Sequence, residues 1–120
     1  MTWKDQVGTT LNDKGAAIQL DGAGSIYVAG FTDGNLAGRV GKFDVVLIKY
    51  AADTTREWTR QFGTVEDDGT DAFAEANLYL STHGGTVYVS GLTLGDVEGA
   101  AQIGLGDVFL ATFDSLGENN

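Results

Sequence analysis

The segment Ile26-Tyr27-Val28-Ala29-Gly30-Phe31-Thr32 recurs further along the chain as Val87-Tyr88-Val89-Ser90-Gly91-Leu92-Thr93. The two segments share the pattern Tyr-Val-(Ala/Ser)-Gly-x-Thr, and their glycines are 61 residues apart. Side chains at alternate positions of each segment fall on opposite faces of an extended backbone, which is the two-residue period of a β-strand. The pair therefore predicts a β-strand that occurs twice.

Further blocks recur in the same order on either side of this strand. The spacing grows from 55 to 63 residues along the chain, because the second copy has gained six residues between Asp68 and Val87. Several matched blocks in one order indicate an internal duplication. The matched blocks are Trp3–Thr9 with Trp58–Thr64, Asp13 with Asp68, Gly34 and Gly38 with Gly95 and Gly99, and Asp44–Leu47 with Asp107–Leu110.

Each copy is expected to contain four short antiparallel strands. In the first copy these strands span residues 16–20, 25–31, 43–50 and 57–62. The third contains the run Val45-Val46-Leu47-Ile48, which is apolar at every position and predicts burial on both faces. The turns depend on Gly, Asn and Asp because the chain has no proline. Residues 71–77 are predicted to form a strand of the second copy, although their alanines also fit a helix.

The composition narrows the classes of function. The net charge of −10 argues against nucleic acid, whose phosphates require basic side chains, and against an anionic membrane surface. The chain has no cysteine, which excludes disulfides and thiolate metal sites. No apolar run approaches the roughly 20 residues of a membrane-spanning helix. Because the first residues do not resemble a signal peptide, we expect a cytoplasmic protein or an excised or mature piece.

The 120 residues are predicted to form one all-β domain, 1–120, of two repeats at about 3–57 and 58–120. A four-stranded repeat of 55 to 63 residues is closer to a propeller blade, about 50 residues in kelch proteins, than to a solenoid coil. The chain resembles the bacterial beta-propeller repeat family, named for seven-bladed propellers. The blocks that carry this resemblance are Trp58, Gln61–Thr64, Asp68, Tyr88–Thr93 and Gly104–Phe109.

The resemblance implies four-stranded antiparallel propeller blades and an extracellular or bacterial cell-surface setting, but no reaction. Two blades cannot close a ring alone. Trp3 to Val7 matches the strand that ends a repeat, whereas the third strand of the second copy, Val108 to Phe113, has no successor. Open blades leave apolar faces and an unpaired strand edge. We therefore expect a homo-oligomer in which each N-terminal strand completes a neighbour's last blade, in a ring or a filament.

Four recurring residues are candidates for ligand binding. Trp3 and Trp58 could stack on a sugar or a base, and alternatively they are the apolar anchors of each blade's last strand. Asp44 and Asp107 place a carboxylate at the start of each third strand. The alternative for this pair is structural, with each carboxylate accepting N–H groups of the preceding turn.

Asp13 and Asp68, which also recur, have the same two interpretations. The matched glycines Gly30 and Gly91 follow apolar strands and predict a bulge or a close approach of the backbone.

An acidic cluster is the candidate metal site. Glu66, Asp67, Asp68 and Asp71 could supply oxygen ligands to Ca²⁺, although their spacing matches no EF-hand, and a solvated loop is the alternative. His83 is the single histidine on which a Ser-His-Asp triad or a histidine metal site would depend. It lies in residues 81–85, which are predicted to form an exposed turn.

The sequence contains no nucleophile elbow, P-loop, dinucleotide fingerprint or zinc motif. The favoured hypothesis is a non-enzymatic propeller module for binding or scaffolding, with a protein or glycan as ligand. A carbohydrate-binding propeller lectin is the alternative, on analogy of architecture. A carboxylate-dependent hydrolase is the third hypothesis, since any acidic β protein contains carboxylate pairs.

Overall fold

The computed structural model describes residues 3–11, 13–38, 44–63, 78–93 and 107–118. These residues form two antiparallel β-sheets, one of four strands and one of three, and none of them lies in a helix. The prediction of an all-β chain is confirmed. In the same residues there is no helix long and apolar enough to cross a membrane.

The first sheet is a meander in the order β1-β2-β3-β4. Its strands are β1 (Asp13–Leu20), β2 (Ile26–Thr32), β3 (Asp44–Tyr50) and β4 (Arg56–Phe62). The bounds of β2, β3 and β4 lie within one residue of the predicted strands, whereas β1 begins three residues earlier than predicted. Every residue of β3 is buried, as its continuous apolar run predicted.

The second sheet has the order β5-β6-β7, with β5 (Leu78–His83), β6 (Thr86–Thr93) and β7 (Asp107–Phe113). No strand of the described ranges pairs with the far edge of β7. The strand predicted at residues 71–77 lies outside the described residues. The predicted turn at 81–85 was too long, because Ser81 to His83 belong to β5 and only Gly84 and Gly85 connect it to β6.

The two sheets repeat each other in register. Ala29 on β2 faces Leu47 on β3, and the matched Ser90 on β6 faces Leu110 on β7. The turns repeat as well: the turn after β3 has Thr54 at φ 74°, and the turn after β7 has Gly117 at φ 81°, 63 residues later. The duplication inferred from sequence is thus also a duplication of backbone geometry.

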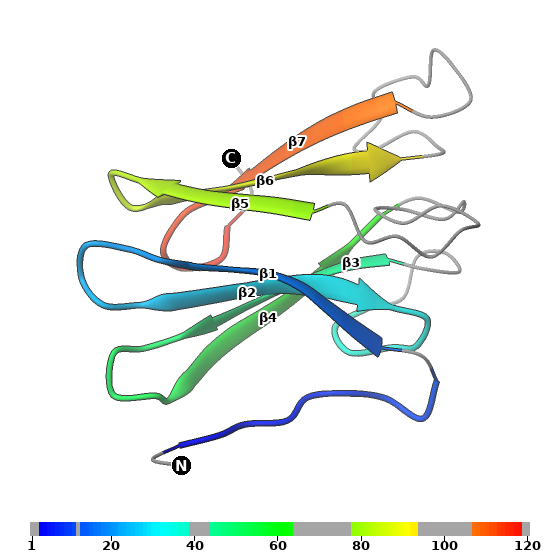
Figure 1. Ribbon diagram of the computed structural model, residues 1–120, viewed down its shortest axis with the longest axis horizontal. Helices are drawn as coiled ribbons and strands as arrows, with labels where there is room; N and C mark the ends of the chain where they lie inside the picture. The colour runs from blue at the N-terminus through cyan, green and yellow to red at the C-terminus, as the bar shows by residue number, and fades with distance from the viewer. Residues whose placement is uncertain (1–2, 12, 39–43, 64–77, 94–106, 119–120) are drawn as a thin grey trace.

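The main core lies between the sheets, which stack with β1 and β2 against β5 (Figure 1). Both sheets supply it with apolar side chains, and Trp58 and Phe62 of β4 pack against it. The buried residues of this core are Tyr27, Ala29, Phe31, Val45, Leu47, Leu78, Val87, Val89, Phe109, Ala111 and Phe113. A smaller cluster, formed by Val46, Ile48 and Tyr50, lies on the opposite face of the first sheet.

Gly30 explains why β1 is irregular. The pairing of β1 with β2 shifts between Gly15 and Ala17, opposite Gly30. A Cβ atom at Gly30 would overlap the carbonyl oxygen of Lys14 and lie 3.1 Å from its carbon. The predicted bulge and close backbone approach are therefore both present at this glycine.

Candidate functional site

Residues 3–9, called here the N-terminal segment, lie on the face of the first sheet that points away from the second sheet. The segment was predicted to pair as a strand with a neighbouring copy, and in the single chain it pairs with no strand of the described residues. The ring of Trp3 packs edge to face on Tyr50, with centroids 5.4 Å apart. Val7 packs against the cluster of Val46, Ile48 and Tyr50. Side chains, and not backbone pairing, therefore hold the segment on the sheet.

A charged cluster fixes this segment near Trp3. The Tyr50 hydroxyl donates a hydrogen bond to Asp5 Oδ2 at 2.8 Å. Arg56 donates to the same oxygen from Nε at 3.0 Å and from Nη2 at 2.7 Å. The hydrogen bonds from Tyr50 and Arg56 lower the pKa of Asp5, while burial and the nearby carboxylate raise the pKa of Tyr50. Three segments of the chain are thereby joined at one carboxylate.

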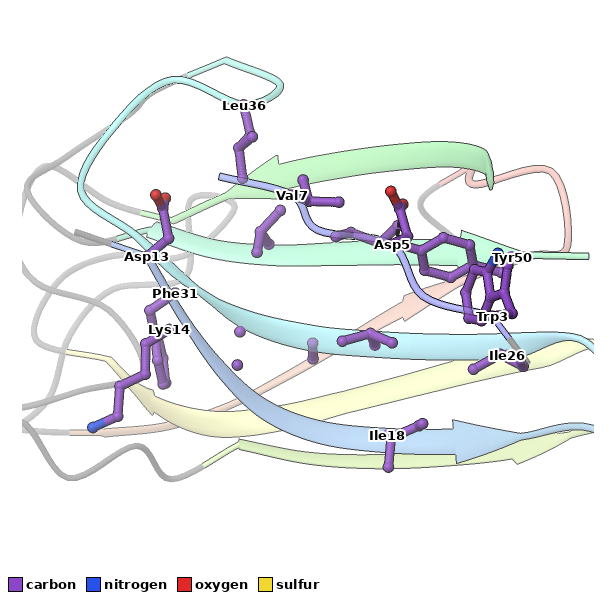
Figure 2. A pocket seen from close by; sticks show the side chains of 16 residues that line it. Trp3, Asp5, Val7, Asp13, Lys14, Ile18, Ile26, Phe31, Leu36 and Tyr50 are labelled. Carbon is purple, nitrogen blue, oxygen red and sulfur yellow. Dashed lines mark hydrogen bonds between the residues drawn. The ribbon is translucent and has the colours of Figure 1, made fainter. Parts of the chain in front are cut away.

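A groove of about 320 Å³ runs between the N-terminal segment and the first sheet. Figure 2 shows Trp3, Asp5 and Val7 along one side of this groove and Ile18 of β1 on the other. Its walls are mainly apolar, with Ile26, Val28, Val46 and Ile48 among the lining residues. Since Asp5 already accepts hydrogen bonds from the protein, the groove is suited to receiving apolar side chains.

The far end of the groove is closed by hydrogen bonds to Asp13. Its carboxylate accepts the N–H of Thr9 at 2.6 Å and the hydroxyl of Thr32 at 2.6 Å. Burial acts to raise the pKa of Asp13, but these hydrogen bonds outweigh it and the pKa is lowered. The Thr32 hydroxyl in turn accepts the N–H of Gly34 at 3.0 Å. Asp13 therefore ties the N-terminal segment to β1 and β2.

Asp44 is fully buried, and its carboxylate accepts a hydrogen bond from Gln61 Nε2 at 2.9 Å. Gln61 also donates to the carbonyl of Gly34, and its own oxygen accepts the N–H groups of Leu36 and Ala37. One glutamine of β4 thus organises the loop between β2 and β3. The matched Asp107 begins β7 opposite Thr93, and its side chain lies outside the described part of the structure.

Trp58 is half-buried and packs against the inter-sheet core. Its ring lies 6.1 Å from Tyr27 and 6.5 Å from Phe113, and its Nε1 donates to the carbonyl of Ser115 at 3.1 Å. The guanidinium of Arg60 lies over the same ring. Trp3, by contrast, is 43% exposed. The two matched tryptophans therefore lie at equivalent positions of the repeat, but Trp58 is more buried than Trp3.

The candidate calcium ligands Glu66, Asp67, Asp68 and Asp71 lie outside the described residues. Within the described ranges, no group of three or more His, Asp or Glu side chains could hold a metal ion. His83 is exposed, but it ends β5 opposite Thr86 and is not part of the turn.

The sequence patterns did not identify Tyr50 and Arg56 as partners of Asp5. The available signal was weak: Tyr50 ends the third strand where Phe113 ends the seventh, so an aromatic residue recurs there. No family model matches the chain, and no curated protein matches it either.

Proposed function

We propose that the chain is a non-enzymatic β-propeller module for binding or scaffolding, and that its copies assemble head to tail. In this arrangement residues 3–7 of one copy pair with the open edge of β7 in the next copy and supply the fourth strand of its blade. The observation that carries the proposal is the unequal pair of sheets: among the described residues, the first repeat has four strands and the second has three. An unpaired edge of backbone donors and acceptors favours addition of a strand.

The position of the N-terminal segment supports this assembly. Trp3 contacts Tyr50 as Trp58 contacts Phe113, and the two pairs are matched in the repeat. Val7 likewise packs on the cluster of Val46 and Tyr50, as its counterpart Phe62 packs on Phe109 and Phe113. The segment therefore lies against the first sheet where the last strand of a preceding blade would lie, and its backbone pairs with no strand of the described residues.

The surface chemistry is consistent with a binding role. The groove is mainly apolar and the chain as a whole is acidic, with 17 Asp and Glu residues against 7 Lys and Arg. The resemblance to bacterial propeller repeats implies an extracellular or cell-surface location, and the ligand we propose there is a protein or a glycan. A glycan array distinguishes a lectin from a protein scaffold.

Deletion of residues 1–8 tests the assembly. The full chain is expected to form an oligomer well above 12.6 kDa in light scattering. The truncated chain is expected to lose that mass, or to aggregate, while its circular dichroism retains the strand signal. A synthetic peptide of residues 1–8 should partly restore the blade. A full-length chain that remains a folded 12.6 kDa monomer at micromolar concentration would show that the proposal is wrong.

A further inference from the structure

Two sheet faces of the chain carry exposed apolar side chains. The outer face of the first sheet is the one that forms the groove, and it includes Ile18, which is 64% exposed. The outer face of the second sheet points away from the core and includes Tyr79 and Leu110, which are 68% and 65% exposed. Tyr79 and Leu110 flank Ser90 in register, so these side chains share one face.

The repeat shows what normally covers the outer face of the second sheet. Leu110 faces Ser90 across β6 and β7, as Leu47 faces the matched Ala29 across β2 and β3. Leu47 has no exposed surface, because its face of the first sheet packs on the second sheet. Leu110 therefore occupies the position of a core residue, but no sheet of the described residues covers it.

The outer face of the first sheet matches, in the repeat, the inner face of the second sheet. Ile18 faces Val28 on β2, as Leu80 faces the matched Val89 on β6. Leu80 packs against the inter-sheet core, on the face that receives the first sheet. The groove beside Ile18 is therefore the counterpart of the inner face of the second sheet. Within the chain, the first sheet already covers that inner face.

We propose that the outer face of the second sheet in one copy seats in the groove of the first sheet in a second copy, so that Leu110 is buried against the face that contains Ile18. The occupant of the groove is another copy of this chain, because the chain already makes the same contact between its own repeats. This inference rests on the head-to-tail assembly proposed above and names the second surface that builds it. Since the two faces differ, the contact is heterologous and each copy has one of each kind.

Two charge variants test this contact, because each alters a side chain that is already exposed in the single chain. Leu110→Glu places a charge on the outer face of the second sheet, which inserts into the groove. Ile18→Glu places a charge on the outer face of the first sheet, which forms the groove. Each variant alone is expected to give a folded monomer in sedimentation velocity. An equimolar mixture is expected to give a one-to-one complex of about twice 12.6 kDa, because the mixture restores one intact pair of faces.

Leu116→Glu is the matched control. Leu116 is 72% exposed in the turn after β7, and its counterpart Asp53 is exposed in the turn after β3, so the contact leaves it in solvent. This variant is expected to assemble like the parent chain.

The outcomes separate the two proposals. If the parent chain assembles and Leu110→Glu assembles equally well, the face contact is overturned while strand completion stands. Two folded monomeric variants that form no complex on mixing overturn the face contact too. A parent chain that is itself monomeric overturns both proposals.

Discussion

The rings of Trp3 and Tyr50 meet edge to face, with centroids 5.4 Å apart and an angle of 77° between their planes. Trp58 and Phe113, the matched residues of the next repeat, lie 6.5 Å apart at 34°. The sequence around each tryptophan recurs, but only Trp58 lies in a strand. Side-chain packing is therefore repeated even where the backbone pairing of the repeat is not.

Trp58→Ala is expected to destabilise the fold by about 2–4 kcal/mol, somewhat less than for a fully buried large aromatic residue because the ring is half-buried. The substitution removes contacts with Tyr27 and Phe113 and the hydrogen bond to Ser115. Urea unfolding followed by circular dichroism measures the change. His83→Ala is the control, expected within about 0.5 kcal/mol of the parent since the side chain is exposed. Equal unfolding midpoints for the two variants would contradict this view of the core.

Gly30→Ala is expected to displace β1 from the first sheet, because the new Cβ would overlap the backbone of Lys14. Backbone cannot move aside as a flexible side chain can, so we expect a loss of at least about 2 kcal/mol. Gly15→Ala on the same bulge is the matched control, since a Cβ there meets nothing within 4 Å. Thermal melts of the two variants compare them directly. A Gly30→Ala protein as stable as Gly15→Ala would show that the bulge adjusts freely.

Most of the first sheet could be predicted from sequence because its strands are periodic and apolar. The beginning of β1 was missed, since Asp13, Lys14 and Gly15 have no apolar pattern and become a strand by pairing with β2. The end of β5 was missed for a related reason. Ser81 to His83 are polar, but the two-residue connection Gly84-Gly85, with φ values of 56° and 83°, allows both strands to pair up to the turn.

The pairing predicted for the N-terminal segment involves a second copy of the chain, so it stays a prediction. A strand forms only where another edge accepts its backbone hydrogen bonds, and residues 3–7 pair with no strand of the described residues. The candidate site was harder to predict than the fold. Tyr50 and Arg56 are paired across one hairpin, but Asp5 lies 45 residues before Tyr50, and sequence periodicity does not indicate that this segment folds onto the hairpin.

The attachment of the N-terminal segment is expected to depend on pH through Asp5. Its pKa is lowered from 3.8 by the hydrogen bonds from Tyr50 and Arg56. A carboxyl whose pKa is lowered in the attached state stabilises that state fully when the pH is above its ordinary pKa. This stabilisation is lost as the pH falls through the lowered pKa. The fluorescence of Trp3, measured in a Trp58→Phe background, should therefore change below pH 3.8, as the segment is released.

Asp5→Asn in the same background is the control for this titration. It removes the ionisable group and leaves an amide of the same shape, so the acid transition should disappear. An identical transition in both proteins would assign the pH dependence to another group, with Asp13 as the next to test because its pKa is also lowered.

Gln61→Glu is expected to destabilise the first sheet at neutral pH and to recover in acid. The amide donates to the buried carboxylate of Asp44 at 2.9 Å, and the substitution replaces this donor with a second negative charge. When two carboxylates are adjacent, the pKa of one of them is raised. The charge repulsion therefore acts when the pH is above that raised pKa, and it is relieved when the pH falls and one carboxylate binds a proton. A loss of about 1–3 kcal/mol is the expected scale for a buried group deprived of its hydrogen bond.

Gln19→Glu provides the control because it makes the same change in charge on a strand of the same sheet. The amide of Gln19 donates to the carbonyl of Leu20, next to it in the chain, so no buried carboxylate faces the new charge. Urea unfolding of both variants at pH 7 and near pH 4 separates the local repulsion from the general effect of a more acidic surface. Only Gln61→Glu should regain stability at the lower pH relative to the parent chain. Parallel behaviour of the two variants would mean that Asp44 is not held by Gln61, and that the loop between β2 and β3 is organised by other contacts.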